Sequence, residues 1–294
     1  MDIRLINAHF MDKMMTRPGL LLILASLAAT AQAPPGVLVD VGGYRVHLHC
    51  SGEGSPAVLV IGGFSFDWGF VQTDVAKLTR ICTYDASGTA WSDSGPTPTC
   101  RNRVDEIHRL LVNSKIEGPW VFVGLSTGAL FARLYARDYP NETAGLVIVD
   151  HAFAPDRPDS PVISTSGPDS PPVLISSTPI LINVEDEPGF NKLPKSIQEL
   201  HRWAASRNPA LPTPEIADAC ASELGSASLA NLPLAVVSTG NESRGYPELQ
   251  ARLLVLSHNS RHFVAQKSFH SIEISQPEVV TAAIRHVVGE TRNQ

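Results

Sequence analysis

The residues 120–150, WVFVGLSTGALFARLYARDYPNETAGLVIVD, decide the fold. An apolar run at 120–123 is typical of a buried parallel strand, and the pentapeptide Gly-Leu-Ser-Thr-Gly follows it. Apolar residues then recur at three- and four-residue spacing until Pro140, which predicts a helix. A second apolar run at 145–149 ends in Asp150. The stretch therefore predicts a strand, a tight turn that carries a serine, a helix and a further strand.

The serine of this turn, Ser126, is a candidate nucleophile. A sharp strand-to-helix turn holds its central residue in a strained conformation that exposes the side chain. Gly124, Gly128 and Ala129 are small, as the close approach of strand and helix requires. The start of the helix offers backbone N–H groups and the positive end of the helix dipole to an oxyanion. The competing interpretation is a turn serine without any chemistry.

The composition narrows the class of protein. The chain has 294 residues, enough for one large α/β domain with an insertion. Its residues are 43% hydrophobic and 18% charged, which indicates a globular protein with a large core. The net charge is −6 and no long basic run is present, so a nucleic-acid partner is not expected.

The N-terminal residues predict an export signal. Lys13 and Arg17 precede an apolar stretch at 19–29 that is too short to span a bilayer comfortably, and small residues follow it. We expect a signal peptide at 1–31, cut after Ala31, and therefore a secreted or periplasmic protein without a stable membrane span after cleavage. An uncleaved membrane anchor is the competing interpretation.

The cysteines suit an exported chain, and metal-binding patterns are weak. Four cysteines allow three disulfide pairings, among which the sequence does not choose; they are Cys50, Cys82, Cys100 and Cys220. No Cys-x-x-Cys pair predicts a zinc site. His47 and His49 alternate on a predicted strand, but nothing nearby completes a metal site, so we expect them on a solvated strand face.

Strand and helix patterns alternate through the first half of the chain. A hairpin is predicted from the alternating segments 36–40 and 44–49. The other predicted elements before the serine turn are strands at 57–61 and 81–84 and helices at 70–78 and 101–115. This rhythm predicts an α/β fold with a mostly parallel central sheet and helices on both faces.

The pattern changes after His151. Residues 152–231 start rich in Pro, Ser and Asp and then show helical patterns near 194–206 and 214–229. A long insertion between core strands predicts a cap or lid over the active face. The α/β core is then expected at 32–151 and 232–294.

The last part of the chain returns to the strand-and-helix rhythm. Strands are predicted at 233–238 and 261–265, and His270 lies on the loop after the second of them. Ser275 and Glu278 have the spacing of a capping box, which predicts the start of the final helix.

Taken together, the motifs resemble those of the α/β-hydrolase family. The resemblance rests on GLSTG at 124–128, the glycine pair at 62–63, LVIVD at 146–150 and KSFHSIEISQPEVV at 267–280. It covers roughly residues 36–151 and 232–290, and it implies the α/β-hydrolase fold with a nucleophile, an acid and a histidine in that chain order. A serine at the turn argues against epoxide hydrolases and haloalkane dehalogenases, which carry an aspartate there.

The resemblance also implies roles for particular residues. His270 would be the base that activates Ser126. The carboxylate that orients His270 would be Asp150, with Glu242 in the loop after the strand at 233–238 as the alternative. The oxyanion hole would be formed by the backbone N–H groups of Thr127 and Gly63.

Aromatic residues follow the early glycine pair. Phe64 is the alternative donor to Gly63 in the oxyanion hole, and Phe64, Trp68 and Trp91 are candidate walls of a substrate pocket.

The predicted function is therefore a serine hydrolase that cleaves small or medium apolar carboxylic esters through an acyl-enzyme on Ser126. No organic cofactor or metal is implied. The alternative is a catalytically weak or inactive ligand-binding protein on the same scaffold. The bond type and the oligomeric state are left open by the sequence.

Overall fold

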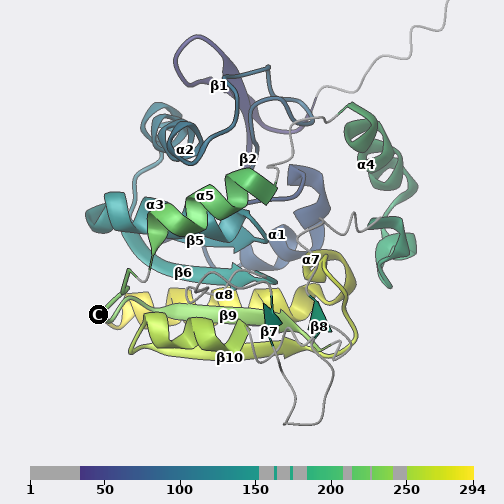
Figure 1. Ribbon diagram of the computed structural model, residues 1–294. Coiled ribbons are helices and arrows are strands. Elements are labelled where there is room, and N and C mark those ends of the chain that lie inside the picture. The colour runs from purple at the N-terminus through teal and green to yellow at the C-terminus, as the bar shows by residue number, and fades with distance from the viewer. Residues whose placement is uncertain are drawn as a thin grey trace, which may run out of the picture. The chain divides into compact units, whose positions relative to one another are not determined.

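A mixed eight-stranded sheet forms the centre of the structure (Figure 1). The structure is a computed structural model, and it describes residues 34–151, 162–163, 173–174, 184–207, 214–225, 227–240 and 250–294. The strands of the sheet are β1 (Val37–Asp40), β2 (Arg45–Ser51), β3 (Ala57–Ile61), β4 (Ile81–Asp85), β5 (Trp120–Leu125), β6 (Thr143–Val149), β9 (Leu234–Thr239) and β10 (Ser260–Ala265). The expected export signal at 1–31 lies outside the described residues.

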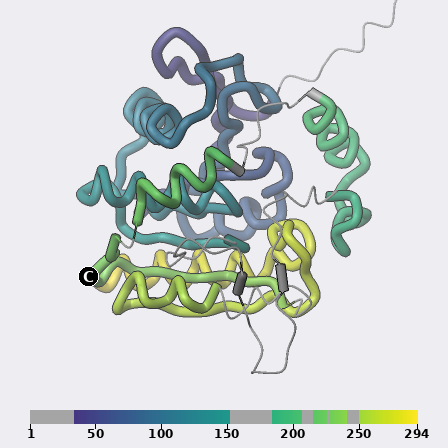
Figure 2. The backbone as a smooth tube through the Cα atoms, viewed as in Figure 1, coloured from purple at the N-terminus to yellow at the C-terminus, as the bar shows by residue number. Residues whose placement is uncertain are grey.

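The strand order is β1-β2-β4-β3-β5-β6-β9-β10. β1 pairs antiparallel with β2 and β2 antiparallel with β4, whereas the neighbours from β4 to β10 are parallel. Figure 2 follows the chain from the hairpin of β1 and β2 at one edge of the sheet, in purple, to β10 at the other edge, in yellow-green. The mostly parallel sheet predicted from the sequence is confirmed.

Helices cover both faces of the sheet. The helices of the described residues are α1 (Gly69–Val75), α2 (Cys100–Ser114), α3 (Gly128–Asp138), α4 (Lys195–Arg207), α5 (Pro214–Leu224), α7 (Ile272–Ser275) and α8 (Pro277–Arg292). Because side chains alternate along a strand, Leu59 and Phe122 pack with α2, α3 and α5, and Val58 and Val121 pack with α1 and α8. Among the helices of the described residues, none combines the length and the apolar character needed to cross a bilayer.

The predicted capping box at the last helix is wrong. α8 begins at Pro277, and its N-cap residue Gln276 makes no side-chain capping bond. Ser275 belongs to the short helix α7, and its hydroxyl donates to the carbonyl oxygen of Ser271. The local spacing fitted a cap, but a separate turn of helix occupies that part of the chain.

The expected exposure of His47 is also wrong. His47 is completely buried, with Nδ1 at 2.8 Å from Asp85 Oδ2 and Nε2 at 2.6 Å from the carbonyl oxygen of Pro35. Ser65 donates from its backbone N–H and from its hydroxyl to the same carboxylate. The ring of Trp91 also packs on the histidine, with the two ring centres 4.9 Å apart. The bonds from Ser65 to Asp85 attach the turn after β3 to the sheet.

The described elements between β6 and β9 pack in different places. They comprise β7 (Val162–Ile163), β8 (Val173–Leu174), the 3-10 turns η3 (Val184–Asp186) and η4 (Phe190–Lys192), and the helices α4 and α5. β7 and β8 pair as a two-stranded sheet of their own. α5 belongs to the core layer, because Ala217, Cys220 and Leu224 share one apolar cluster with α2 and α3.

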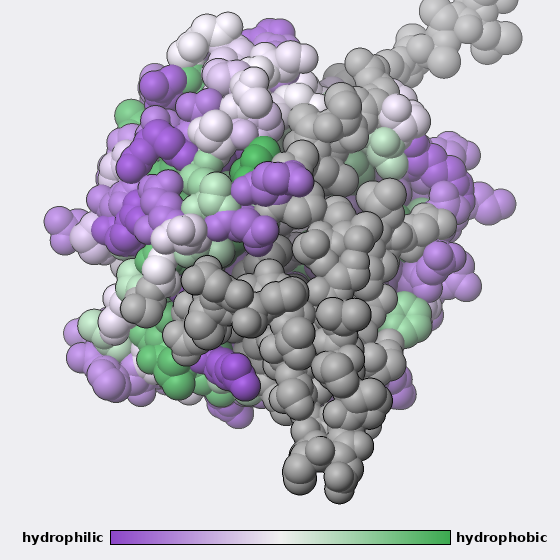
Figure 3. Space-filling model, in the orientation of Figure 1, coloured by the Kyte–Doolittle hydropathy of each residue, from purple (hydrophilic) through white to green (hydrophobic). Residues whose placement is uncertain are grey.

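α4 instead covers the loop that follows β3. Its apolar side packs on Phe64 and Phe66 through Leu200, Trp203 and Ala204. Its exposed side is hydrophilic, as Figure 3 shows for the surface at the right of the view. The boundaries of a cap at 152–231 remain a prediction.

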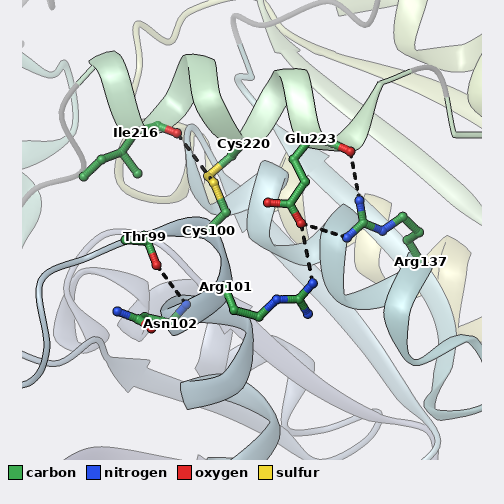
Figure 4. Close-up of a disulfide and its surroundings, with 8 residues drawn as sticks. All are labelled: Thr99, Cys100, Arg101, Asn102, Arg137, Ile216, Cys220 and Glu223. Atoms are coloured by element: carbon green, nitrogen blue, oxygen red, sulfur yellow. Dashed lines mark hydrogen bonds and ion pairs between the residues drawn. A yellow bond between two sulfur atoms is a disulfide. The ribbon is translucent and has the colours of Figure 1, made fainter.

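Two disulfides settle the cysteine pairing that the sequence left open. Cys50 is bonded to Cys82 between β2 and β4, and Cys100 is bonded to Cys220 between α2 and α5. Figure 4 shows the second bridge, with Glu223 of α5 paired nearby to two arginines, Arg101 and Arg137. Such exposed ion pairs contribute about 0–1 kcal/mol each. Closing a loop of 120 residues contributes about 5 kcal/mol in the chain-entropy model, so the disulfide dominates this contact.

We predict that replacing both cysteines of this bridge, Cys100→Ser with Cys220→Ser, lowers the free energy of unfolding by about 2–5 kcal/mol. The loss follows from the greater freedom of the unfolded chain, and urea denaturation measures it. The matched control is Cys50→Ser with Cys82→Ser, which removes a disulfide that spans only 32 residues. Its free energy of unfolding should fall by about 1 kcal/mol less in the same model. Equal unfolding curves for the wild type and the Cys100/Cys220 variant would contradict this prediction.

Candidate active site

The predicted catalytic residues lie at the carboxyl ends of neighbouring strands. Ser126 follows β5, Asp150 follows β6, and His270 lies on the loop after β10. β6 is the neighbour of β5, and only β9 separates β6 from β10. Parallel strands place their carboxyl ends along one edge of the sheet, which is where ligands bind in open α/β folds.

Ser126 occupies a strained turn between β5 and α3. Its φ angle is 53°, in the left-handed region that residues other than glycine rarely adopt. The surrounding structure holds this conformation, because the Ser126 N–H donates to Val149 O at 2.9 Å and Ser126 O accepts from Ala129 N at 3.1 Å. His151 Nδ1 lies 3.0 Å from the same carbonyl oxygen. The strain at this serine matches the conformation expected of an exposed nucleophile.

The loop after β3 lies directly against this turn. A Cβ atom added to Gly128 would lie 2.1 Å from the carbonyl oxygen of Ile61, and one added to Gly62 would lie 2.6 Å from that of Leu125. Gly62 also has a φ angle of 108°. Both positions therefore require glycine, since only a residue without a Cβ lets the two backbone segments approach this closely.

Asp150 and His270 form a hydrogen-bonded pair. Asp150 Oδ2 lies 2.6 Å from His270 Nδ1, and the two side chains are 7% and 28% exposed. The other carboxylate oxygen, Oδ1, accepts from Gln250 Nε2 at 2.6 Å. The backbone of Asp150 is held too, because its N–H donates to Val237 O at 2.8 Å. A carboxylate at Nδ1 favours the tautomer that leaves Nε2 free to accept a proton.

Two other predictions for the triad concern the contact of Ser126 with His270 and the alternative acid Glu242. Among the hydrogen bonds of the described residues, none joins the Ser126 hydroxyl to His270 Nε2. Catalytic hydrogen bonds are often long in unliganded structures and shorten when substrate binds. Glu242, the alternative acid, lies outside the described residues.

Trp68 lies in the core beneath the loop after β3. It is completely buried, in the apolar cluster that α1 and α8 form with the sheet. Its indole N–H donates to Gly62 O at 3.0 Å. The side chain therefore supports the glycine pair, and a role as a pocket wall remains a prediction.

Phe64 and Trp91 belong to an aromatic group between the loop after β3 and α4. The ring of Phe64 stacks on Phe66 at 5.4 Å, and Phe66 meets Trp91 edge-on at 5.2 Å. Trp203 of α4 lies 6.2 Å from Trp91. Asp67, in the turn η1 (Ser65–Trp68), is tied to α4 as well, with Oδ2 at 3.1 Å from His201 Nδ1. The aromatic group and this polar contact join α4 to the candidate oxyanion loop.

The site contains buried polar residues that the sequence did not predict. Gln250 holds Asp150, and Glu187 accepts backbone hydrogen bonds from the loop of His270. Neither residue lies in a recognisable motif. Glu187 follows Glu185 and Asp186, and such an acidic run is typical of a solvated turn, so its burial could not be inferred.

Glu273 of α7 is buried, and its Oε2 has no hydrogen-bond partner among the described residues. Burial raises the pKa of its carboxyl well above the ordinary value of 4.5, and the negative charges of Asp67, Glu187 and Asp150 raise it further. Within the described parts of the chain, no group of three or more His, Cys, Asp or Glu side chains is placed to hold a metal ion.

Comparison with known sequences identifies relatives without an assigned function. The chain matches no protein-family model. It is 28% identical to an uncharacterized protein of Schizosaccharomyces pombe over 44% of this chain and 31% of that protein. It is 27% identical to an uncharacterized vacuolar membrane protein of Saccharomyces cerevisiae, over 36% and 20% of the two chains. The uncharacterized protein YqjL of Bacillus subtilis is 25% identical over 80% of this chain and 85% of its own length. The chain thus spans about a third or less of the two fungal relatives.

Comparison with solved structures identifies the fold. A thermophilic esterase from Thermogutta terrifontis superposes with a TM-score of 0.65 at 21% identity, over 88% of this chain and 99% of that one. A putative lipase from Acinetobacter baumannii gives 0.67 at 17%, over 88% and 92%. The epoxide hydrolase CorEH gives 0.64 at 14%, over 86% and 98%. Together with the strand order, these similarities show that the chain has the α/β-hydrolase fold.

We predict that Glu273→Gln stabilises the protein at neutral pH. Below about pH 4.5 the carboxyl is protonated in both the folded and the unfolded chain, and the pKa shift has no effect. Between that pH and the raised pKa of the folded state, only the unfolded chain ionises, so stability falls as the pH rises. Glu273→Gln removes this loss, and thermal unfolding from pH 4 to pH 9 should show a smaller decline than in the wild type.

The matched control for this prediction is Glu278→Gln, at an exposed position of α8. Its unfolding temperature should follow the wild type at each pH. A Glu273→Gln protein with the same decline as the wild type would show that the buried carboxyl is not protonated in the folded state.

Proposed function

We propose that this chain is a serine hydrolase that cleaves small or medium apolar carboxylic esters through an acyl-enzyme on Ser126. The observation that carries the proposal is the strained turn at Ser126 together with the hydrogen-bonded pair of Asp150 and His270 at the same edge of the sheet. No cofactor takes part in the proposed reaction.

The first half of the reaction forms the acyl-enzyme. His270 Nε2 takes the proton of the Ser126 hydroxyl as Oγ bonds to the carbonyl carbon of the ester, and the carbonyl oxygen becomes an oxyanion. The carbon–oxygen bond to the alcohol then breaks, and the alcohol leaves with the proton from His270. Asp150 stabilises the imidazolium that exists between these steps, because its Oδ2 lies against Nδ1.

The second half releases the acid. A water molecule gives a proton to His270 as its oxygen attacks the acyl carbon, and the bond to Ser126 Oγ breaks as the serine takes that proton back. The carboxylic acid departs, and the free enzyme is restored. Gln250 acts on both halves through Asp150, whose carboxylate it keeps in place.

The oxyanion hole is proposed at the backbone N–H groups of Thr127 and Gly63, with Phe64 as the alternative to Gly63. The contact between Gly62 and Leu125 supports this assignment, because it brings the loop after β3 to the serine turn. The beginning of α3 adds the positive end of a helix dipole at the same place. Donors fixed in advance in this way are worth several kcal/mol to a developing oxyanion.

An apolar substrate is supported by the aromatic group that Phe64 and Trp91 form under α4. The presence of a serine rather than an aspartate in the turn supports ester cleavage over epoxide opening, whatever the overall fold shares with an epoxide hydrolase. Export is supported by the two disulfides, since such bonds persist in oxidising compartments. A secreted or periplasmic esterase is therefore the proposed identity.

We predict that a fluorophosphonate probe labels the wild-type protein and does not label Ser126→Ala, because the probe reacts with an activated serine. Asp150→Asn should reduce the labelling rate about 10³- to 10⁴-fold, since the amide favours the wrong tautomer of His270. Glu242→Gln is the matched control, and its rate should stay within about twofold of the wild type. A panel of p-nitrophenyl esters of increasing acyl length then measures the chain-length preference.

The same assay distinguishes the competing assignments. A steep loss in Glu242→Gln, with Asp150→Asn little changed, would move the acid to the loop after β9. A folded wild-type protein that the probe does not label would contradict the proposal and favour a ligand-binding protein on the same fold.

A further inference from the structure

Glu187 lies against the loop that carries His270. It occupies the turn between η3 and η4 and is only 3% exposed. Its Oε1 accepts the backbone N–H of His270 at 2.6 Å and that of Ser271 at 2.7 Å, and its Oε2 lies 3.3 Å from the N–H of Phe269. One carboxylate thus receives three successive backbone N–H groups.

These contacts satisfy donors that the loop cannot pair by itself. The three N–H groups lie on the loop between β10 and α7, outside the hydrogen-bonded ladders of strand and helix, and a buried donor of this kind needs an acceptor. Successive N–H groups in such a turn form a concave site that favours an anion. Hydrogen bonds to a charged acceptor are about twice as strong as neutral ones. Glu187 is therefore suited to hold the backbone of His270 in place.

The segment that carries Glu187 is itself fixed to α7. Val184, Phe190 and Leu193 share a buried apolar cluster with Ile274. A Cβ atom added to Gly189 would lie 2.4 Å from the carbonyl oxygen of Ile274, so backbone meets backbone there. This packing places the segment 184–193, which lies between β6 and β9 in the sequence, against α7 near the end of the chain (Figure 1).

The position of His270 thus depends on two carboxylates. Asp150 binds the ring at Nδ1, whereas Glu187 binds the backbone on both sides of the same residue. The ring can meet Ser126 only if the loop is held, because a displacement of about 1 Å in a reacting group costs on the order of 100-fold in rate.

We propose that Glu187 is a positioning residue for His270, so that the segment 184–193 takes part in the active site and does not only cover it. This inference rests on the proposed function for its effect on the reaction. The effect on the loop itself does not depend on that function.

The experiment compares Glu187→Ala, Glu187→Gln and Glu185→Gln in the full-length protein. Glu185 is the matched control, because it lies two residues away and forms an exposed ion pair with Arg202. The limiting rate of fluorophosphonate inactivation should fall about 10- to 100-fold in Glu187→Ala, with the concentration for half-maximal rate unchanged. Glu187→Gln should lose less, since its amide oxygen at the place of Oε1 keeps the two short bonds. Glu185→Gln should match the wild type.

Hydrogen exchange of the amides at 269–271 provides the second readout, followed by mass spectrometry of a peptide that covers 266–275. Exchange should be at least about tenfold faster in Glu187→Ala than in the wild type or in Glu185→Gln, with the unfolding temperature measured alongside. The same exchange rates can be compared in variants that also carry Ser126→Ala, because this readout does not require an active serine.

The outcomes separate the two proposals. Wild-type inactivation and exchange rates in Glu187→Ala would overturn the positioning role. If that variant does not fold, Glu187→Gln decides, and its full activity and protection with weakened stability alone would reduce Glu187 to a structural residue. A wild-type protein that the probe does not label would contradict the hydrolase proposal. The exchange rates would still show whether Glu187 holds the His270 loop.

Discussion

The close approach of three backbone segments at Ser126 is the constraint on which the rest of the structure depends. The end of β5, the start of α3 and the loop after β3 meet where Gly62 and Gly128 leave no room for a side chain. A left-handed serine costs about 1–3 kcal/mol, so it persists only because the surrounding structure holds it. The packing of strands and helices on both sides of the sheet offsets that cost. The conformation of Ser126 therefore depends on the whole core.

The buried carboxyl groups around this turn differ in the hydrogen bonds that they receive. The carboxylate of Asp150 contacts His270 and Gln250, and that of Glu187 accepts three backbone N–H groups. Glu273 is buried near them, but its Oε2 has no hydrogen-bond partner among the described residues, and burial raises the pKa of its carboxyl. Desolvation decides the state of a buried acid unless hydrogen bonds compensate for it.

The chain between β6 and β9 contributes both to the core and to the loops around the proposed site. α5 is joined to the core by packing and by the Cys100–Cys220 bond, whereas α4 and the segment 184–193 contact the two loops that flank the proposed site. His201 of α4 contacts Asp67 in the loop after β3. Glu187 accepts the backbone N–H groups of residues 269–271 in the loop after β10. The described parts of this region thus hold both loops in place by packing and by hydrogen bonds.

The sequence by itself determined the sheet, the helices on its two faces and the serine turn, because these depend on apolar periods and small residues within short stretches. It also placed Asp150 and His270 after strands whose ends must meet. Only the tertiary structure decided the cysteine pairing, the burial of His47, and the contacts of Glu187 and Gln250. The last two join residues 83 and 100 positions apart, and the second disulfide spans 120. No local pattern encodes such contacts, since each arises only when the folded core brings distant segments together.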